Sequence, residues 1–455
     1  MPIVSQNPAT EEVRRRFEPH DAAQVDAALN RAVAAGAALR AGGVRARAAA
    51  LAEAARVLER REDDLSATMT EEMGKTRASA RAEVQKCALA CRYYAEHAEG
   101  FMRPETVPGA GAVVPLPLGP ILAVMPWNFP LWQVVRFAAP ALAAGNPGLL
   151  KHASNVPRCA LALEEVFAEA GFPGGAFQAL LVGADRVEAI LRDDRVRGVT
   201  LTGSGPAGAA VARVAGDAIK PSLLELGGTD AFLVMPSADL DAAAEAAVQG
   251  RTQNNGQSCI AAKRFLVHAA VYDAFRERFA ARMEALTLGD PMAAGTDVGP
   301  LATKAGREEV GGLVSEALSN GARRVVGAEV VEGPNDGRGW WYAPGILEDV
   351  PEAAAAFREE VFGPVALLFR VRSLDAAIDL ANDTPLGLGS AIFTREEAEK
   401  REAVQRLEAG ATAINRIVAS DPRLPFGGIK ASGYGRELAR DGLMAFVNRK
   451  MVTES

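Results

Sequence analysis

The sequence predicts an α/β protein with parallel sheets, and the main observation is an alternation of short apolar runs with helical stretches. From about residue 112 the apolar runs are bounded by Gly and Pro, as buried strands are, and helical stretches separate them. Strands that alternate with helices in this way form parallel sheets. The expected strands are 121–125, 148–150, 177–182, 199–202 and 223–226, and the intervening helices are 157–170 and 206–219.

A second α/β set follows the first set, and a helical segment precedes both. Further strands are expected at 232–235 and 264–267, with helices at 238–250 and 272–285. Residues 21–100 carry apolar side chains at three- and four-residue spacing, which predicts helices, and Gly74 is an expected stop. The boundary at Gly227 and Gly228 places Glu225 at a seam between two domains, where ligands often bind.

Composition and charge exclude several classes of function. The 455 residues suggest two to three domains, and the formal net charge of −7 argues against a nucleic-acid partner, which requires a basic face. Four cysteines without the spacing of a small secreted domain, and a start without signal-peptide features, indicate a cytoplasmic protein. The most apolar stretch, 121–150, is interrupted by Pro, Asn and Arg, so no membrane span is expected. The four histidines are scattered, so no metal site is expected.

Cys259 and Glu225 are the residues with the most informative chemistry. An ionised thiol is a strong nucleophile, and a carboxylate can take a proton from a water molecule. Together they indicate covalent catalysis at a carbonyl carbon, followed by hydrolysis. Taken singly, each has an ordinary explanation, because a lone Cys is more often a small buried hydrophobic residue and a lone Glu a solvated charge.

A glycine pattern in the segment 203–208 points to a dinucleotide. The segment reads Gly-Ser-Gly-Pro-Ala-Gly, follows an expected strand and opens an expected helix, where backbone N–H groups and the helix dipole can hold a pyrophosphate. The pattern alone is also compatible with an ordinary tight turn. In the usual arrangement an acidic residue about twenty positions later binds the ribose, and Glu225 stands there. Two functions for Glu225, catalytic base and ribose ligand, are therefore open at this point.

Eight short motifs lie along nearly the whole chain in a specific order and spacing. They are Asn7-Pro8-Ala9-Thr10, Pro126-Trp127-Asn128-Phe129-Pro130, Lys151-His152-Ala153-Ser154-Asn155, Thr202-Gly203-Ser204, Glu225-Leu226-Gly227-Gly228, Gly256-Gln257-Ser258-Cys259, Glu359-Glu360-Val361-Phe362-Gly363-Pro364 and Pro425-Phe426-Gly427-Gly428. With these motifs the chain resembles the aldehyde dehydrogenase superfamily.

The resemblance implies an aldehyde dehydrogenase-like α/β fold with two parallel-sheet domains and a small oligomerisation element. The first expected domain is a Rossmann-type NAD(P)-binding domain at 1–227, interrupted near 105–120 by an oligomerisation strand segment. A catalytic domain is expected at 228–425, and an oligomerisation or C-terminal tail at 426–455. The protein is expected to form a homodimer or homotetramer.

The resemblance also implies that Glu225 is the catalytic base. In that family the Glu of the Glu-Leu-Gly-Gly motif activates the water that hydrolyses a thioester, and the ribose ligand comes from the earlier strand end, at Lys151. Cys259 is the implied nucleophile, and Asn128 with the Cys259 backbone N–H would hold the tetrahedral oxyanion. The residues implied to bind the cofactor are Pro126, Trp127, Lys151, Ser154, Gly203, Ser204, Glu360 and Phe362.

The residues after Asn128 are similar to the succinate-semialdehyde dehydrogenase subgroup, particularly its shorter bacterial members. There an Arg on the following helix pairs with the distal carboxylate of the substrate, and Arg136 stands at that position. Some relatives use a second Arg six residues before the nucleophile, where this chain has Gln253 as the substrate-side residue. Ser420 is expected to donate a hydrogen bond from the loop at the substrate mouth. The expected small-molecule substrate is succinate semialdehyde, and the alternative is another aliphatic aldehyde or semialdehyde.

The preference between NADP and NAD is predicted from Ser154. NAD-selective relatives often carry Glu three residues after the Lys, and its carboxylate repels a 2′-phosphate. Ser154 is neutral and lies beside the cation Lys151, so NADP is expected to be preferred, with NAD also used. A coenzyme A-acylating relative is a further alternative, which Glu225 argues against. Retention of Cys259, Glu225 and Asn128 argues against a non-catalytic relative.

Overall fold

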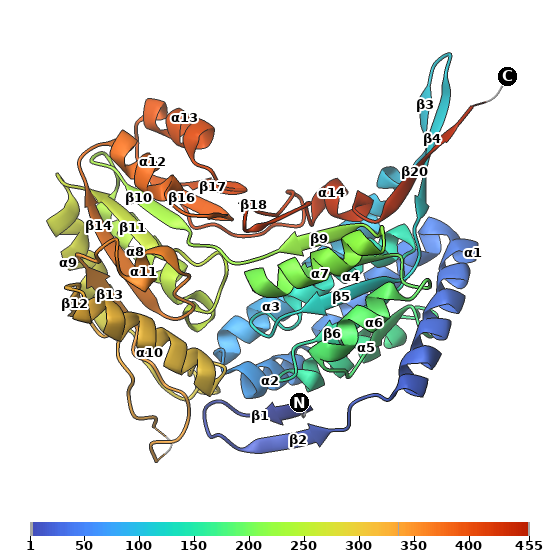
Figure 1. The fold of residues 1–455 in the computed structure, drawn as a ribbon, viewed down its shortest axis with the longest axis horizontal. Helices are drawn as coiled ribbons and strands as arrows, with labels where there is room; N and C mark the ends of the chain where they lie inside the picture. Colours follow the sequence, from blue (N-terminus) through green and yellow to red (C-terminus); the bar gives the residue numbers. More distant parts are fainter. Residues whose placement is uncertain (1–2, 335, 454–455) are drawn as a thin grey trace.

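Two largely parallel sheets organise the chain (Figure 1), which a computed structural model describes at residues 3–334 and 336–453. The first sheet has the order β19-β9-β8-β5-β6-β7, and only β19 runs antiparallel to its neighbour. Its strands are β5 (Ile121–Met125), β6 (Gly148–His152), β7 (Phe177–Ala179), β8 (Gly198–Thr202), β9 (Ser222–Glu225) and β19 (Gly433–Tyr434). The chain runs from β5 outward to β7 and then returns to β8, so the strand order reverses between β5 and β8.

Alternate side chains of the first sheet pack into two hydrophobic clusters, one on each face. Ile121 and Ala123 of β5 join a cluster with α3, α4 and α5, whereas Leu122 joins a cluster with α6 and α7. The helices of this part are α1 (Ala22–Arg60), α2 (Glu62–Met73), α3 (Arg77–Phe101), α4 (Trp132–Ala144), α5 (Pro157–Glu169), α6 (Val187–Arg192) and α7 (Gly205–Asp217), and η1 (Ala184–Arg186) is a short 3-10 turn.

Local signals set the limits of the first three helices. Asp21 and Gln24 form a capping box at the start of α1, in which each side chain accepts from the other residue's backbone N–H. Gly43 has non-helical backbone angles and kinks α1. Gly74 ends α2 in the left-handed conformation, as the sequence predicted, and Thr76 caps α3 by accepting from the Ser79 N–H.

The second sheet has seven strands in the order β12-β13-β14-β11-β10-β16-β17, and only β12 is antiparallel. Phe232 and Phe265 pack on one face with α8 and α9, whereas Leu233 and Leu266 pack on the other with α10 to α13. The strands are β10 (Ala231–Val234), β11 (Arg264–His268), β12 (Arg323–Val326), β13 (Gly345–Glu348), β14 (Val365–Val371), β16 (Gly389–Phe393) and β17 (Ala411–Ile414). The helices are α8 (Leu240–Thr252), η2 (Gln253–Gly256), α9 (Tyr272–Glu284), α10 (Lys304–Ser319), α11 (Ala355–Arg358), α12 (Leu374–Asn382) and α13 (Glu397–Arg406).

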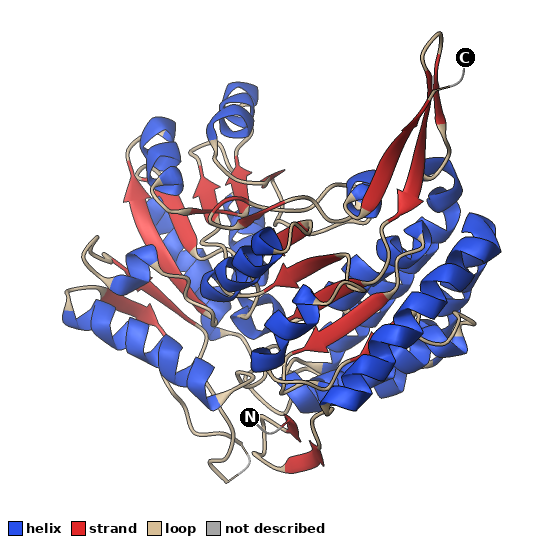
Figure 2. Ribbon diagram, turned by 45° about the vertical axis from the view of Figure 1, so that its right-hand side comes forward, coloured by secondary structure: helices blue, strands red, loops and turns tan. Residues whose placement is uncertain are grey.

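After the second sheet the chain returns to the first. β18 pairs with β15, β19 adds to the edge of β9 with Gly433 opposite Glu225, and β20 pairs with β4. β20, β4 and β3 form a three-stranded sheet that projects from the rest of the chain (Figures 1 and 2). The remaining elements are β1 (Ile3–Gln6), β2 (Val13–Phe17), β3 (Glu105–Val107), β4 (Gly111–Pro117), β15 (Leu386–Gly387), β18 (Ile429–Lys430), α14 (Ala439–Met444) and β20 (Val447–Val452).

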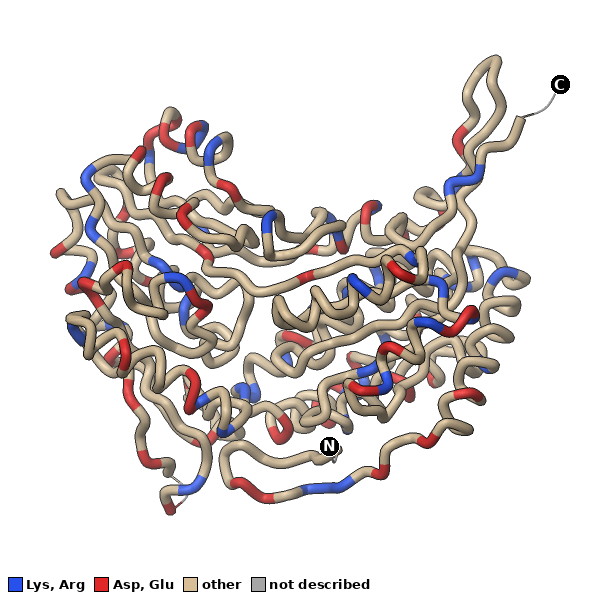
Figure 3. Tube along the Cα trace, in the orientation of Figure 1, with Lys and Arg blue, Asp and Glu red and all other residues tan. Residues whose placement is uncertain are grey.

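Most predicted strands and helices occur within a few residues of their expected limits. The strand expected at 177–182 ends at Ala179. The Leu180 N–H still donates to the Leu150 carbonyl, but the Val182 N–H donates to the Leu180 carbonyl and so turns the chain away from the sheet. Acidic and basic residues are interspersed along the helices and loops around both sheets (Figure 3). Among the described residues, no helix combines the length and the apolar character that a membrane crossing requires.

Candidate active site

The loop that carries Cys259 is shaped by three consecutive residues with left-handed backbone. Asn254, Asn255 and Gly256 have φ values of 57°, 57° and 75°. Asn tolerates this region better than other non-glycine residues, because its short polar side chain can hydrogen-bond locally. A Cβ at Gly256 would lie 2.4 Å from the backbone nitrogen of Pro364. The Asn-Asn-Gly sequence therefore produces the sharp turn that leads to the nucleophile.

The two asparagine side chains anchor this nucleophile loop on opposite sides. Asn254 Nδ2 donates to the carbonyl of Asn128 at 2.6 Å. Asn255 Nδ2 donates to the carbonyls of Gly74 at 2.8 Å and Pro300 at 3.0 Å. The loop is thereby tied to the segment after β5, to the end of α2 and to the segment before α10.

Asn128 is buried beside the nucleophile loop. Its Nδ2 donates to the carbonyl of Gln257 at 3.1 Å, and its second amide hydrogen can serve another acceptor. Among the described residues, no backbone hydrogen bond uses the Cys259 N–H as a donor. His152 contacts both ends of the 125–130 segment, since its two ring nitrogens lie 3.2 and 2.9 Å from the carbonyl oxygens of Met125 and Pro130. The two predicted oxyanion donors therefore belong to adjoining, well-anchored segments.

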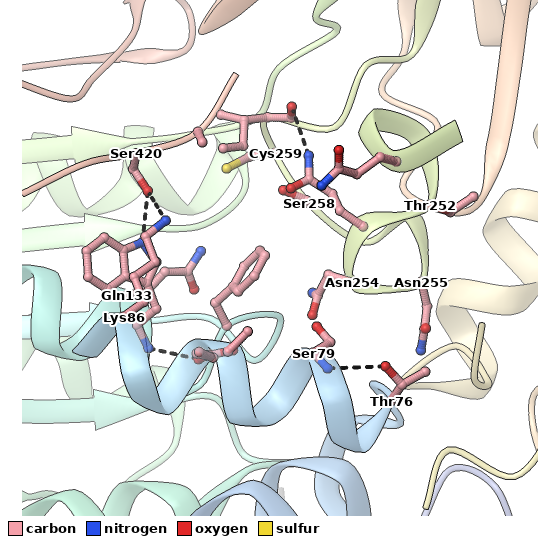
Figure 4. A pocket seen from close by; sticks show the side chains of 18 of the residues that line it. Thr76, Ser79, Lys86, Gln133, Thr252, Asn254, Asn255, Ser258, Cys259 and Ser420 are labelled. Atoms are coloured by element: carbon pink, nitrogen blue, oxygen red, sulfur yellow. Dashed lines mark hydrogen bonds between the residues drawn. The ribbon is translucent and has the colours of Figure 1, made fainter. Parts of the chain in front are cut away.

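Cys259 lines a cavity of about 360 Å³ (Figure 4). The cavity wall comes from α3, α4, α8, the nucleophile loop, Asp297 and the loop before β18. Three residues that the sequence assigned to the substrate, Arg136, Gln253 and Ser420, line this same cavity. The structure thus brings the predicted nucleophile and the predicted substrate residues together.

The surroundings of Cys259 disfavour the thiolate form of its side chain. Burial raises the pKa of the thiol to about 12, while the positive charges of Arg136 and Lys263 act to lower it. Lys263 Nζ donates to the Cys259 carbonyl at 2.6 Å and pairs with Glu360 Oε1 at 2.9 Å. Because the Glu360 carboxylate opposes thiolate formation, its movement away from Lys263 would favour the thiolate.

Glu225 ends β9 and is not part of the cavity lining. Only 2% of the residue is exposed, and its Oε1 has no hydrogen-bond partner among the described residues. The carboxyl lies against the Gly427 backbone, where a Cβ would approach Oε1 to 2.7 Å. Burial raises the pKa of Glu225 well above its usual range, although Arg136 opposes this and Glu437 adds to it. In this arrangement burial disfavours the ionised carboxylate, and the carboxyl is separate from the cavity that holds the Cys259 thiol.

Arg136 lines the cavity but already has an anionic partner. Its Nε forms an ion pair with Glu437, and only 3% and 4% of the two side chains are exposed. Its Nη2 donates to Thr202 Oγ1 at 3.3 Å, and the guanidinium lies 4.7 Å from the centre of the Phe426 ring. Among the hydrogen bonds of the described residues, none uses Nη1, which leaves this group for a ligand.

Ser420 is held by two donors at the cavity wall. Lys86 Nζ donates to its hydroxyl oxygen at 2.8 Å and Trp132 Nε1 at 3.1 Å (Figure 4). The hydroxyl oxygen is the acceptor in both bonds, so its own hydrogen remains available to a ligand. Gln253 makes only long contacts, from Nε2 to the carbonyls of Gly250 at 3.5 Å and Ile260 at 3.4 Å.

The carboxyl edge of the first sheet gathers most of the predicted cofactor residues. Ligands of open α/β sheets bind at this edge, where the strand order reverses. Pro126 and Trp127 follow β5, while Gly203 and Ser204 follow β8. Lys151 lies opposite Val124 near the end of β6. Ser204 is the exposed N-cap of α7 and makes no side-chain cap, which leaves the first N–H groups of α7 for an anion.

The last Gly of the 203–208 segment packs closely against Leu226. A Cβ at Gly208 would lie 2.7 Å from a methyl group of Leu226, so a larger residue there would force the Leu226 side chain to shift. Ser154 is exposed and follows β6 near Lys151, whose pKa burial lowers.

Glu360 and Phe362 reach the same region from the second α/β unit. The Phe362 and Trp127 rings meet edge to face, with 5.8 Å between centres. Glu360 Oε2 would lie 2.4 Å from a Cβ at Gly227. These contacts join the segment after β5 and the Glu-Leu-Gly-Gly segment to the Glu360 loop. No group of three or more His, Cys, Asp or Glu residues in the described part of the chain is arranged to hold a metal ion.

Three charged residues at the site were missed by the sequence interpretation: Lys86, Lys263 and Glu437. Lys86 shares a helix face with Ser79 and Glu83, and the spacing of these polar residues beside apolar ones was the available signal. Lys263 lies four residues after Cys259, close enough to have been considered. Glu437 lies in a segment interpreted only as an oligomerisation tail, and it has no local motif of its own.

Comparison with known proteins decides the family. A family model described as the aldehyde dehydrogenase family matches residues 2–452. The chain belongs to the aldehyde dehydrogenase family. The aldehyde dehydrogenase fold predicted from the motifs is thereby confirmed.

Several aldehyde dehydrogenases are similar over nearly their whole length. Succinate-semialdehyde dehydrogenase (NADP+) 1 of Mycobacterium tuberculosis (strain ATCC 25618 / H37Rv) is 54% identical over 458 residues, which cover 99% of both chains. The succinate-semialdehyde dehydrogenase (NADP+) of Mycobacterium avium (strain 104) is 52% identical over 99% of this chain and 96% of its own. The structure of succinic semialdehyde dehydrogenase from Streptococcus pyogenes in complex with NADP+ superposes with a TM-score of 0.95 at 36% identity, covering 99% and 100% of the two chains. The resemblance to the bacterial succinate-semialdehyde subgroup is confirmed.

Proposed function

We propose that this aldehyde dehydrogenase oxidises succinate semialdehyde to succinate, with NADP+ as the preferred cofactor and NAD+ as a usable one. The observation that carries the proposal is the cavity in which Cys259 faces basic and hydroxyl side chains, because a carboxylate-bearing aldehyde requires a nucleophile and a cationic end in one site. The names of the similar mycobacterial and streptococcal enzymes support the same substrate and cofactor.

The reaction begins with addition of the Cys259 thiolate to the aldehyde carbon. The carbonyl oxygen becomes an oxyanion as the C–S bond forms, and the Asn128 amide with the Cys259 N–H donates to it. Arg136 and Lys263 assist formation of the thiolate, because their charges lower the thiol pKa that burial has raised.

The carboxyl edge of the first sheet fits the cofactor. The uncapped N-terminus of α7, with Gly203 and Ser204, would hold the pyrophosphate, and Lys151 with Ser154 would hold the adenosine ribose and its phosphate. Pro126, Trp127, Glu360 and Phe362 would line the remainder of the groove, in keeping with the edge-to-face contact of the two rings. When bound, the nicotinamide accepts the hydride that the former aldehyde carbon loses.

Loss of that hydride leaves a thioester on Cys259, which water must hydrolyse. We assign the base to Glu225, which takes a proton from the water while the C–S bond breaks and the acid leaves. Its carboxyl is buried, has a raised pKa and lies outside the cavity lining, so it must turn toward the cavity, where contact with water lowers its pKa and favours the ionised base. This requirement suits a residue that has no hydrogen bond holding its Oε1 among the described residues.

The remaining expectations concern the organisation of the chain. We propose a cofactor domain at 1–227, a catalytic domain at 228–425 and an oligomerisation tail at 426–455, with the strand segment near 105–120 joined to the tail. Pairing of β20 with β4 in the projecting sheet supports this grouping, and a homodimer or homotetramer would cover that sheet. A cytoplasmic location stays a prediction.

The test is steady-state turnover on a panel of aldehydes with both nicotinamide cofactors. Succinate semialdehyde with NADP+ should give the highest kcat/KM, and Cys259→Ala should abolish turnover while leaving folding and NADP+ binding intact. A higher kcat/KM for an uncharged aldehyde would refute the substrate. Turnover by Cys259→Ala above a few per cent of wild type would refute the nucleophile.

A further inference from the structure

Two cations, Arg136 and Lys86, line the substrate cavity, and they differ in how their charge is balanced. The Arg136 guanidinium is in an ion pair with the buried Glu437. Lys86 is in no ion pair with any described carboxylate, and the nearby Glu83 is paired with Lys75 instead. The uncompensated positive charge of the cavity therefore resides on Lys86.

Lys86 is also the better placed of the two for an incoming carboxylate. Its Nζ donates one hydrogen bond to Ser420 and lies 4.4 Å from the centre of the Trp132 ring, so two of its three hydrogens remain for a ligand. Both side chains of the Lys86–Ser420 pair border the cavity that holds Cys259 (Figure 4). A carboxylate there would receive one hydrogen bond from the ammonium and one from the hydroxyl.

The Arg136 side of the cavity offers less to the same anion. A substrate carboxylate bound by Arg136 alone would place a second negative group on a guanidinium that Glu437 already neutralises. The two carboxylates would repel each other in a buried setting, where such repulsion is poorly screened. Binding at Lys86 adds a negative group to an uncompensated positive one.

We propose that Lys86, with the hydroxyl of Ser420, binds the distal carboxylate of the acid semialdehyde and so determines the preference for acidic over uncharged aldehydes. The proposal rests on the proposed function and names the residues that carry its specificity. Lys86 lines the cavity from α3, whereas Cys259 lines it from the nucleophile loop.

The experiment compares Lys86→Met and Lys86→Arg with wild type on succinate semialdehyde and on butanal, which has the same carbon chain without the carboxylate. Lys86→Met should raise KM for succinate semialdehyde about tenfold or more, as expected for loss of one charge-assisted hydrogen bond, and should leave kcat within about twofold. KM for butanal should stay unchanged, and Lys86→Arg should restore much of the preference. Lys304→Met, at an exposed lysine of α10, is the matched control.

A pH profile separates a charge effect from a packing effect. Burial and the neighbouring Arg136 lower the pKa of Lys86 to about 8, while Cys87, Glu83 and Asp421 act to raise it. The kcat/KM for succinate semialdehyde should therefore fall relative to that for butanal as pH rises through about 8, because the ammonium is lost. Lys86→Arg should remove this relative fall, since arginine keeps its charge.

Three results would overturn the assignment. If Lys86→Met keeps the wild-type preference for succinate semialdehyde, Lys86 does not bind the substrate carboxylate, while the proposed function of the enzyme is unaffected. If KM rises equally for both aldehydes, Lys86 only shapes the cavity wall. If wild type itself prefers butanal, the proposed substrate fails, and the role of Lys86 fails with it.

Discussion

The buried ion pair between Arg136 and Glu437 should contribute strongly to the free energy of unfolding. Both side chains are almost completely buried, and they come from α4 and from the segment between β19 and α14. Replacing Glu437 with Gln leaves a buried guanidinium without an anion, and arginine cannot lose its proton to escape that cost. Replacing Arg136 with Met leaves a carboxylate, which can become neutral by binding a proton.

The expected penalty for Glu437→Gln is about 3–5 kcal/mol, the range for breaking a buried pair from one side. With an unfolding entropy of ~2 cal/mol/K per residue, a cooperative unit of this chain's length has ~1 kcal/mol/K, so Tm should fall by about 3–5 °C. Arg136→Met should cost less at low pH, where Glu437 can bind a proton. Differential scanning calorimetry at a fixed protein concentration measures both.

The pH dependence should distinguish the two variants. Burial already raises the pKa of Glu437 in the presence of Arg136, and removal of Arg136 raises it further. A carboxyl with a raised pKa in the folded state stabilises the fold at low pH, and this stability is lost as pH rises through the folded pKa. The Arg136→Met deficit should therefore grow once pH rises above the folded-state pKa of Glu437 in wild type, whereas the Glu437→Gln deficit should shrink as pH rises, because only wild type carries the titrating carboxyl.

The double variant, Arg136→Met with Glu437→Met, is the decisive control. It removes both charges together, so it should be more stable than Glu437→Gln alone. The account of a buried ion pair would be refuted if the stability loss of the double variant equalled the sum of the losses of the two single variants. It would also be refuted if the two single variants lost the same stability with the same pH dependence.

Two further outcomes are expected at the catalytic and cofactor positions. Glu225→Gln should retain a rapid burst of reduced cofactor but slow steady-state turnover by about 10²–10⁴-fold, because thioester hydrolysis loses its base; equal slowing of both phases in stopped-flow absorbance would instead implicate Glu225 in thiol activation. Ser154→Glu should lower the ratio of kcat/KM with NADP+ to kcat/KM with NAD+ by about tenfold or more, because the new carboxylate repels the 2′-phosphate. An unchanged ratio would show that Ser154 does not contribute to recognition of the phosphate.

The parts of the structure that are predictable from sequence are those with local causes. Strands such as β5 and β8 are short apolar runs between Gly and Pro, and their hydrophobic side chains leave few other arrangements. The nucleophile loop is also local, because Asn254, Asn255 and Gly256 tolerate left-handed backbone where most residues do not.

The charge pairing around the cavity could not be predicted in this way. Lys86 and Ser420 are 334 positions apart, and the bond between them exists only because α3 and the loop before β18 meet at one wall. Arg136 was predicted to meet a substrate carboxylate, but its partner Glu437 lies in a segment whose placement depends on β19 adding to the first sheet. The resting position of Glu225 likewise depends on the Gly427 backbone, which no motif near Glu225 specifies.

The return of the C-terminal segment to the first sheet has a consequence for biosynthesis. Arg136 and the strands beside it are synthesised long before β19 and Glu437. Until residue 437 emerges, Arg136 has no counterion and the β9 edge has no neighbouring strand. The nascent chain therefore carries an open β9 edge and an unpaired Arg136 charge until β19 and Glu437 are synthesised. Stalled or C-terminally truncated chains are the species in which this region would expose the β9 edge to aggregation and to chaperones.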